Sequence, residues 1–276
     1  MGTAGGAMIP AVPLSDESHI AMIKEGNLVF IEASAEDAFE TGICCSKDRK
    51  SAGYQCKVAW LRLPYNKEVR LLLVNKDVDG IIGFAEYMPS GAAWRPVSAE
   101  NYMFIQCIAM YRKASRSQGT AGKMLAILEE KALSQGMNGV CTMCSSGTWM
   151  AGKRLFEKNG YVVCDQLGRF ELLYKAFRPG APAPSLIDRT SQLDNYQGWH
   201  LLYADQCPWH QKAVSDLKEA AAENHLELNI TRLETPEQAR HAPTGYGTFG
   251  LIKDGKLLAD HYISKTRFLN ILRKEL

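Results

Sequence analysis

The 276-residue sequence predicts a mixed α/β (α+β) protein in which strands and helices alternate. The apolar run over 102–110 is long enough for one buried strand, and the apolar run over 139–144 predicts another. Between them, an apolar-periodic segment over 123–135 predicts a helix. A strand, a turn and an alanine-rich helix come in the same order over 199–223. This order of elements indicates two α/β units.

A turn rich in small residues separates the strand at 102–110 from the helix that follows it. The turn comprises Arg116, Ser117, Gln118, Gly119, Thr120, Ala121 and Gly122. A pyrophosphate needs backbone N–H groups that no Cβ obstructs, and a helix N-terminus supplies such donors together with a favourable dipole. The turn is therefore expected to bind an anionic ligand.

This turn resembles the Gln/Arg-x-x-Gly-x-Gly/Ala signature of the GCN5-related N-acetyltransferases, with Arg116, Gly119 and Ala121 at the specified positions. Residues 155–161 look like the second hallmark of that superfamily, a helix that ends in a glycine and an aromatic residue before a strand. The resemblance implies an acyl-coenzyme A N-acyltransferase fold in the first part of the chain. It also implies acyl-coenzyme A as co-substrate, with acetyl-CoA as the default.

The resemblance further implies where the co-substrate binds. Its pyrophosphate would contact residues 116–122, and its pantetheine arm would pair with the backbone of Ile108 and Met110. Backbone N–H groups of the same strand would polarise the thioester carbonyl.

Three further segments, 42–45, 53–61 and 91–97, resemble the bacterial YoaP-like acetyltransferases. Chains of that branch carry a short C-terminal YoaP-like domain, and the tail from Thr244 onward is similar to it. The resemblance leaves the acceptor unspecified, so the expected acceptor is an amine of a small molecule or of a peptide. The sequence leaves open whether the chain forms a homodimer.

Histidine is absent between Ile20 and Trp199, so the first unit must deprotonate the acceptor amine with another group. The candidates are Glu86, Tyr87, Glu100, Tyr102 and an ordered water. Glu86 is the preferred general base, because it lies near the end of the expected strand over 80–89, beside the strand over 102–110. The alternative is a solvated carboxylate without a catalytic role.

Many members of the superfamily protonate the departing thiolate with a tyrosine of the last helix. That position here looks like Phe156, so the sequence departs from the pattern. Either Tyr161 or a water is expected to replace the tyrosine, or the thiolate leaves without assistance. Coenzyme A thiolate is a good leaving group, so the substitution does not forbid the reaction.

Three residues are expected to bind the acceptor. Arg95, preceded by Trp94, is suited to gripping a carboxylate of the acceptor. Cys107 lies on the strand that would hold the pantetheine arm, where it would line the active site. The structural alternatives are a loop anchored by a buried indole and a thiol packed in the core.

A break in composition divides the chain. Three prolines within 178–185 prevent a helix and favour an extended connector. Histidine usage changes at the same place. We therefore expect an acyltransferase domain over 1–178, a Pro-rich linker over 179–196 and a small second domain over 197–276.

The second domain resembles the thioredoxin fold in the order of its elements. A strand over 199–204 leads through a turn into a helix over 211–223. Later, a hairpin is expected to turn at Asp254 and Gly255, and a helix over 265–274 closes the domain. The resemblance implies a thioredoxin-like accessory domain.

Cys207 is a further catalytic candidate. The segment from Cys207 to His210 stands where thioredoxins have Cys-x-x-Cys, and Pro243 stands where they have a cis-proline. A helix N-terminus stabilises a thiolate, and His210 is expected to add positive charge. Because His210 is no resolving thiol, an ordinary dithiol cycle cannot run. The alternatives are a structural or substrate-binding role, one-thiol chemistry, or a non-catalytic module that binds a thiol or a metal.

Composition argues against several classes of protein. The formal net charge of +2 gives no basis for binding nucleic acid or acidic membranes. No uncharged run reaches the ~18 residues of a membrane helix, and the start lacks the pattern of a secretory signal. The eight cysteines are expected to be reduced, and Cys141 and Cys144 would face opposite sides of a strand rather than share a metal. We expect a cytoplasmic protein without a bound metal.

Overall fold

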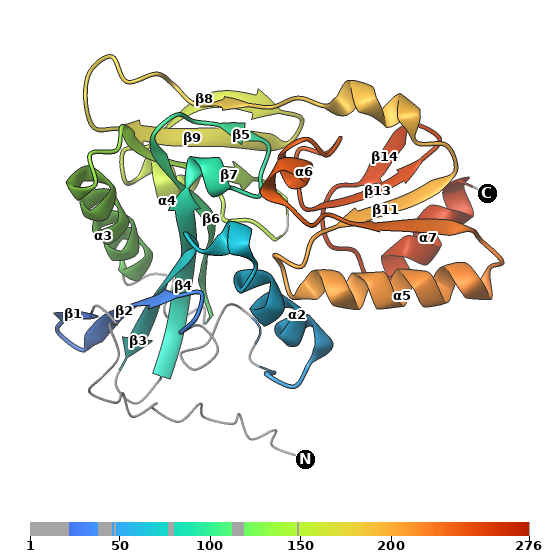
Figure 1. Ribbon diagram of the computed structural model, residues 1–276, viewed down its shortest axis with the longest axis horizontal. Coiled ribbons are helices and arrows are strands. Elements are labelled where there is room, and N and C mark those ends of the chain that lie inside the picture. The colour runs from blue at the N-terminus through green and yellow to red at the C-terminus, as the bar shows by residue number, and fades with distance from the viewer. Residues whose placement is uncertain are drawn as a thin grey trace.

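Two β-sheets, of eight and four strands, lie side by side with helices packed on both (Figure 1). This computed structural model describes residues 22–37, 46, 48–76, 80–111, 119–147 and 149–275. We call the described residues up to 177 the N-terminal unit and residues 199–275 the C-terminal unit. The mixed α/β fold class predicted from the sequence is confirmed.

The larger sheet belongs to the N-terminal unit and has the strand order β1-β2-β3-β4-β6-β7-β9-β8. Its strands are β1 (Met22–Glu25), β2 (Leu28–Ser34), β3 (Arg70–Lys76), β4 (Gly80–Pro89), β6 (Tyr102–Met110), β7 (Gly139–Ser145), β8 (Val162–Leu167) and β9 (Phe170–Ala176). Among its described strands, β6 and β7 form the one parallel pair. The strands predicted at 80–89 and 102–110 are β4 and β6, and they are neighbours as expected.

Helices cover both faces of this sheet. They are α2 (Ala52–Leu61), α3 (Thr120–Ser134) and the short α4 (Arg154–Glu157). Side chains of β3 alternate between the faces, because successive residues of a strand point to opposite sides. Leu71 and Leu73 belong to the core that includes α2, whereas Leu72 and Val74 belong to the core that includes α3.

The smaller sheet forms the C-terminal unit and has the strand order β12-β11-β13-β14. Its strands are β11 (Trp199–Tyr203), β12 (Leu228–Arg232), β13 (Phe249–Lys253) and β14 (Lys256–Ala259), and its helices are α5 (Trp209–Glu223), α6 (Pro236–Arg240) and α7 (Lys265–Glu275). β11 is parallel to β12 and antiparallel to β13. The predicted hairpin is confirmed, since Asp254 and Gly255 have the positive φ of 46° and 77° that a tight hairpin turn requires.

The Pro-rich segment between the units makes contacts of its own. Its strand β10 (Ser185–Leu186) pairs with β5 (Val97–Ser98), and the 3₁₀ helix η5 (Thr190–Asn195) follows. The side chain of Leu193 packs against a core that the two units share. The pairing of β10 with β5 fixes the connector to the N-terminal unit by backbone hydrogen bonds. The other short helices, both in the N-terminal unit, are η1 (Pro64–Asn66) and η3 (Ser90–Ala92).

The two units share a hydrophobic core. Tyr54 and Trp60 of α2 cluster with Leu202 and Ile252 from the face of the small sheet opposite α5 and α7. The ribbon shows α2 lying against α5 across this junction (Figure 1). Backbones approach closely here, because a Cβ on Gly53 would lie 2.0 Å from the carbonyl oxygen of Pro208. A side chain at position 53 would thus force α2 and the start of α5 apart.

Candidate active site

A cavity of about 650 Å³ lies where the two units meet. The N-terminal unit contributes residues 106–110 of β6 and Ala121 of α3 to its walls. Residues 206–209, Tyr246 and Tyr262 of the C-terminal unit form the opposite wall. Both units are therefore needed to enclose this space.

The cavity opens at the point where two strands of the large sheet separate. The parallel ladder of β6 and β7 extends only from Tyr102 and Gly139 to Ile105 and Thr142. Beyond this point β6 still pairs with β4 on its other side, as far as Met110. The Thr142 Oγ1 hydroxyl donates to the Ile105 carbonyl, 2.9 Å away, where the ladder ends. One backbone edge of 106–110 thus has no strand partner among the described residues.

Helix α3 begins at the same cavity. Gly119 is its N-cap, with φ of 73°, a value that residues with a Cβ rarely adopt. The helix starts at Thr120, three residues before the predicted start and directly after this glycine. Ala121 lines the cavity, and a Cβ on Gly122 would lie 3.1 Å from Asn159 Oδ1. Of the predicted phosphate-binding turn, Arg116, Ser117 and Gln118 lie outside the described residues.

Glu86, the predicted general base, lines the cavity within a buried polar cluster. Its Oε2 accepts a hydrogen bond from the Lys57 ammonium at 2.5 Å, and its Oε1 accepts one from Gln206 Nε2 at 2.8 Å. The Lys57 ammonium also lies 3.8 Å from the ring centroid of Trp60. Lys57 and Glu86 are each only 1% exposed. We call Lys57, Glu86 and Gln206 the buried junction, because it joins the two units.

Sequence reasoning did not identify Lys57 or Gln206. Lys57 carries a detectable signal, since a charged residue within the apolar helical run 56–61 is expected to face a partner or a cavity. The sequence around Gln206 contains no such signal. It precedes Cys207 in a turn and meets a carboxylate 120 residues away in sequence.

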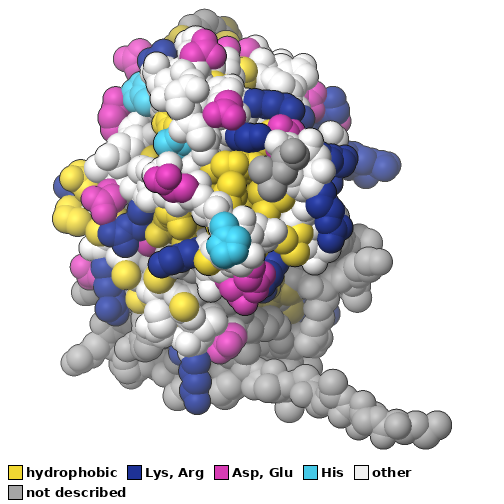
Figure 2. Space-filling view, turned by 90° about the vertical axis from the view of Figure 1, so that its right-hand side faces the viewer, with side chains coloured by type: hydrophobic (Ala, Val, Ile, Leu, Met, Phe, Trp, Pro, Cys, Tyr) yellow, Lys and Arg dark blue, Asp and Glu magenta, His cyan; other side chains and the backbone are white. Residues whose placement is uncertain are grey.

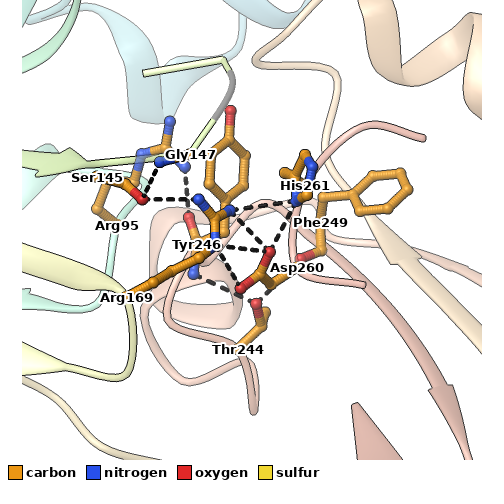
Figure 3. A network of polar contacts seen from close by, with 9 residues as sticks. All are labelled: Arg95, Ser145, Gly147, Arg169, Thr244, Tyr246, Phe249, Asp260 and His261. Carbon is orange, nitrogen blue, oxygen red and sulfur yellow. Dashed lines mark hydrogen bonds and ion pairs between the residues drawn. The ribbon is translucent and has the colours of Figure 1, made fainter. Parts of the chain in front are cut away.

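Arg95 lines the cavity, whereas its neighbour Trp94 does not. The Trp94 indole is fully buried, donates to Asn66 Oδ1 at 2.8 Å and packs edge-on against Trp60. It anchors the loop, in line with the structural alternative. The Arg95 guanidinium lies 3.7 Å from the ring centroid of Tyr246, and its Nη1 donates to the Tyr246 carbonyl at 2.5 Å (Figure 3).

Two thiols line the cavity from opposite units, Cys107 on β6 and Cys207 just before α5. His210 adds no positive charge beside Cys207, contrary to expectation. Burial lowers the pKa of His210 to about 3, outweighing its bond to the Ala204 carbonyl, and the positive charges of Arg95 and Lys57 lower it further. The ring is therefore neutral at physiological pH.

Pro243 also departs from the thioredoxin pattern. Among the described residues every peptide bond is trans, so Pro243 is not the cis-proline that the resemblance implied. Its neighbour Thr244 is buried, and the Thr244 hydroxyl donates to the Phe249 carbonyl at 3.1 Å. The segment serves as a turn that brings Tyr246 to the cavity wall.

Phe156 belongs to α4 and Tyr161 follows that helix, and their rings lie 5.7 Å apart between centroids. Phe156, the residue expected in place of the superfamily's tyrosine, lines the cavity. Tyr161 packs against Phe156 in the apolar core of the N-terminal unit and is not among the lining residues. Burial, together with the nearby Glu129 carboxylate, raises the pKa of Tyr161 far above its ordinary value. The structure therefore does not bring Tyr161 to the cavity.

Three aromatic side chains from the two units line a further part of the cavity. Trp149 packs edge-on against Tyr262 at 4.8 Å between ring centroids, and Trp209 lies 5.8 Å from Trp149. Trp149 is 45% exposed and has φ of 72°, unusual for a bulky residue. We call Trp149, Trp209 and Tyr262 the aromatic rim.

A second polar cluster joins the units, and none of its four residues lines the cavity (Figure 3). Arg169 Nε and Nη2 donate to the Asp260 carboxylate at 2.7–3.1 Å, and Arg169 Nη1 donates to Ser145 Oγ at 2.7 Å. His261 Nδ1 lies 2.8 Å from Asp260 Oδ1. We call Ser145, Arg169, Asp260 and His261 the outer junction.

The described surface gives few other signs of a binding site. In the part of the chain that the structure describes, no three His, Cys, Asp or Glu side chains gather as a metal site would require. No described helix combines the length and the apolar character needed to cross a bilayer. Figure 2 shows acidic and basic side chains intermixed over the face of the C-terminal unit.

Comparisons with known proteins give similarities along both units. The family model described as YoaP-like matches residues 227–270. The "Uncharacterized N-acetyltransferase YoaP" of Bacillus subtilis (strain 168) is 23% identical over 251 residues, covering 89% of this chain and 98% of that protein. A match of this extent includes parts of both units.

Solved structures cover somewhat more than half of the chain at lower identity. The PaiA N-acetyltransferase from Thermoplasma acidophilum, in complex with coenzyme A, is 16% identical with a TM-score of 0.38, covering 54% of this chain and 99% of that chain. The ribosomal-protein-S5-alanine acetyltransferase from Vibrio fischeri is 10% identical with a TM-score of 0.40, covering 59% of this chain and 100% of that chain.

Proposed function

We propose that the protein is an acyl-coenzyme A dependent N-acyltransferase, with acetyl as the default acyl group and an amine of a small molecule or peptide as acceptor. The observation that carries the proposal is the separation of β6 from β7 beyond Ile105 and Thr142, with a cavity at the gap. An exposed strand edge inside a cavity suits a ligand that is itself rich in amides. The pantetheine arm of coenzyme A is such a ligand.

The pantetheine arm binds along the open edge of β6. Its two amides pair with the backbone of Ile108 and Met110, as an extended peptide adds to a sheet edge. The pyrophosphate lies at the start of α3, where backbone N–H groups of Gly119 to Gly122 and the helix dipole favour an anion. Arg116, Ser117 and Gln118 remain proposed contacts of the same phosphates.

Acyl transfer proceeds in one step within the cavity. A backbone N–H of β6 polarises the thioester carbonyl, the acceptor amine attacks the carbonyl carbon, and the thiolate leaves. Glu86 takes the amine proton directly or through a water. A carboxylate offers about four lone-pair positions, so two remain after the bonds from Lys57 and Gln206. Because Phe156 stands at the wall and Tyr161 lies in the core, water protonates the thiolate.

The curated relative supports this proposal, since its name describes an N-acetyltransferase and the similarity spans both units. The C-terminal unit is proposed as a thioredoxin-like accessory domain. In support, a strand, a helix, a parallel strand, an antiparallel hairpin and a final helix follow one another in it. Cys207 and its neighbours then serve as one wall of the acceptor site.

Substitution of Ala121 by aspartate tests the proposal. A carboxylate at this position would face the pyrophosphate, and like charges in contact cost several kcal/mol, which corresponds to a loss of affinity of about a hundredfold or more. Calorimetry with coenzyme A measures the affinity, and Ala121→Ser is the control of similar size without charge. An unchanged affinity in a folded Ala121→Asp variant would contradict the proposed cofactor site. Mass spectrometry after incubation with acetyl-CoA and amines then detects transfer.

A further inference from the structure

We propose that the acceptor amine also carries a carboxylate, and that Arg95 and Gln106 bind this carboxylate at the inner wall of the cavity. The inference rests on the proposed function and names the substrate class for it. Two observations support it. Inside the cavity, the described residues leave one positive charge without a counter-charge, and they leave hydrogen-bond donors without partners. The class comprises amino acids and related amino carboxylates.

Arg95 supplies a buried positive charge that no described carboxylate balances. Among the described residues, three side chains with formal charges line the cavity, and two of them, Lys57 and Glu86, neutralise each other. Arg95 is 3% exposed, and its contacts are the carbonyl and the ring of Tyr246. No carboxylate of the described residues forms an ion pair with it. A buried guanidinium is stable only with a counter-charge, so the site is suited to an anion.

Unused hydrogen-bond donors lie beside this charge. Arg95 Nε and Gln106 Nε2 are buried and have no partner among the described residues. The backbone N–H of Trp94 donates to Gln106 Oε1 at 3.2 Å, which leaves the amide nitrogen of Gln106 to donate. Two unpaired donors and no unpaired acceptor on these side chains match a carboxylate, which accepts only.

The acceptor, rather than the co-substrate, must supply this carboxylate. Close to the thioester, the pantetheine arm carries amides and no charge, and its phosphates lie at the start of α3. Gln106 immediately precedes Cys107 on β6, next to the point where β6 leaves β7. The carboxylate is thereby held near the place where the amine must meet the thioester.

The aromatic rim suggests the body of this acceptor. Trp149, Trp209 and Tyr262 line the same cavity and present apolar ring surface. An amino acid with an apolar or aromatic side chain places its carboxylate on Arg95 and its side chain along the rim. Matched probes are therefore pairs of an amino acid and the amine that lacks only its carboxylate.

The first experiment compares such pairs on the full-length protein with saturating acetyl-CoA. The pairs are phenylalanine with phenethylamine, leucine with 3-methylbutylamine, and alanine with ethylamine. A charge-assisted contact to a carboxylate corresponds to about tenfold to a hundredfold in kcat/KM, so each amino acid is expected to exceed its partner by that factor. Equal rates within a pair, or faster reaction of the bare amine, would overturn the inference.

Gln106→Glu is the matching variant. The new carboxylate keeps the bond from Trp94 N–H, pairs with Arg95 and repels a carboxylate of the acceptor. We expect the ratio of kcat/KM for phenylalanine to kcat/KM for phenethylamine to fall by about tenfold or more. If Gln106 had only a structural role, the variant would lower kcat/KM for both substrates by the same factor, and that result counts against the inference. Gln192→Glu on the exposed surface of η5 makes the same change of charge and is the control.

Failure of this inference is distinguishable from failure of the proposed function. If coenzyme A binds and bare amines are acetylated at least as well as amino acids, the enzyme assignment holds and the carboxylate site is refuted. If coenzyme A binds but no member of any pair reacts, the carboxylate site is likewise refuted. If coenzyme A does not bind, the proposed function itself fails, and calorimetry reports this before any turnover is measured.

Discussion

The buried junction and the outer junction join the same two units with the same chemistry, a carboxylate paired with a cation, but in different surroundings. At the buried junction Lys57 and Glu86 are each 1% exposed, and Gln206 completes the pair. At the outer junction the side chains of Arg169 and Asp260 are 26% and 21% exposed (Figure 3). Water therefore replaces a lost partner more readily at the outer junction than at the buried junction. The two junctions should therefore respond very differently to the same substitution.

The largest effect is expected at Glu86. Glu86→Gln leaves the Lys57 ammonium buried without its counter-charge, and removal of one partner of a buried pair costs about 3–5 kcal/mol. Urea denaturation, followed by circular dichroism, measures the free energy of unfolding. The same variant should reduce turnover by about a hundredfold or more if Glu86 is the base.

A double variant separates these two roles of Glu86. In Lys57→Met with Glu86→Gln, the uncompensated charge is gone, so most of the lost stability should return. If Glu86 is the base, turnover stays low in this stable variant. Recovered turnover would show that Glu86 has only a structural role, and unchanged stability in the single variant would show that the pair is accessible to water.

A second effect comes from His210, a buried ring that packs against Tyr246 and Phe249. Burial lowers the pKa of His210 to about 3 in the folded protein, whereas an unfolded histidine has a pKa of about 6.5. At a pH between these two pKa values, the unfolded chain binds one more proton than the folded protein does. The stability contributed by the neutral ring is therefore present above pH 6.5 and is lost as the pH falls, by about 1.4 kcal/mol per unit.

His210→Asn tests this pH dependence. The asparagine amide can still donate to the Ala204 carbonyl, as His210 Nδ1 does at 2.8 Å, but it does not titrate. The free energy of unfolding falls from pH 7 to pH 5, and this fall should be about 2 kcal/mol smaller in the variant than in the wild type. Exposed His225, changed to asparagine, is the control. Equal pH dependence of His210→Asn and wild type would mean that the ring is accessible to protons.

The smallest effect is expected at the outer junction. Asp260→Asn should cost about 1–2 kcal/mol at pH 7, between the values for exposed and fully buried pairs. Burial alone would raise the pKa of Asp260, but hydrogen bonds from His261 and Arg169 and their charges lower it to about 2. An unfolded aspartate has a pKa of about 3.9. The contribution of Asp260 is thus present above pH 4 and is lost as the pH falls toward 2.

Urea titrations of the wild type and Asp260→Asn at pH 7 and pH 3 check this prediction. The difference in stability between the two proteins should be smaller at pH 3. A cost at pH 7 as large as that of Glu86→Gln would remove the distinction between the two junctions. A difference that grew at pH 3 would contradict the direction of the pKa shift.

Elements with a local signal could be predicted from the sequence. The run over 102–110 is β6, because a nine-residue run that is apolar except for Gln106 suits a strand buried on both faces. The hairpin at Asp254 and Gly255 could be predicted because aspartate and glycine tolerate the positive φ of a tight turn. Helix boundaries were less certain, and α5 begins at Trp209, two residues before the predicted start.

The cavity walls could not be predicted in the same way. The Arg95 side chain meets the Tyr246 carbonyl across 151 residues of sequence, and Glu86 meets Gln206 across 120. No periodicity or spacing reports contacts of this kind, since they depend on how one unit packs on the other. Polar residues within apolar runs, such as Lys57 and Gln106, were the local signals available for these contacts. The charge state of His210 depended on the same packing, so the expected positive charge was wrong.

The division of the cavity walls between the two units also constrains biosynthesis. A ribosome releases the chain from its N-terminus at about 5–20 residues per second, and the eight strands of the large sheet emerge before the C-terminal unit. The walls formed by residues 206–209, Tyr246 and Tyr262 emerge last. A nascent chain that stops before Cys207 would contain every strand of the large sheet and still lack one side of the cavity.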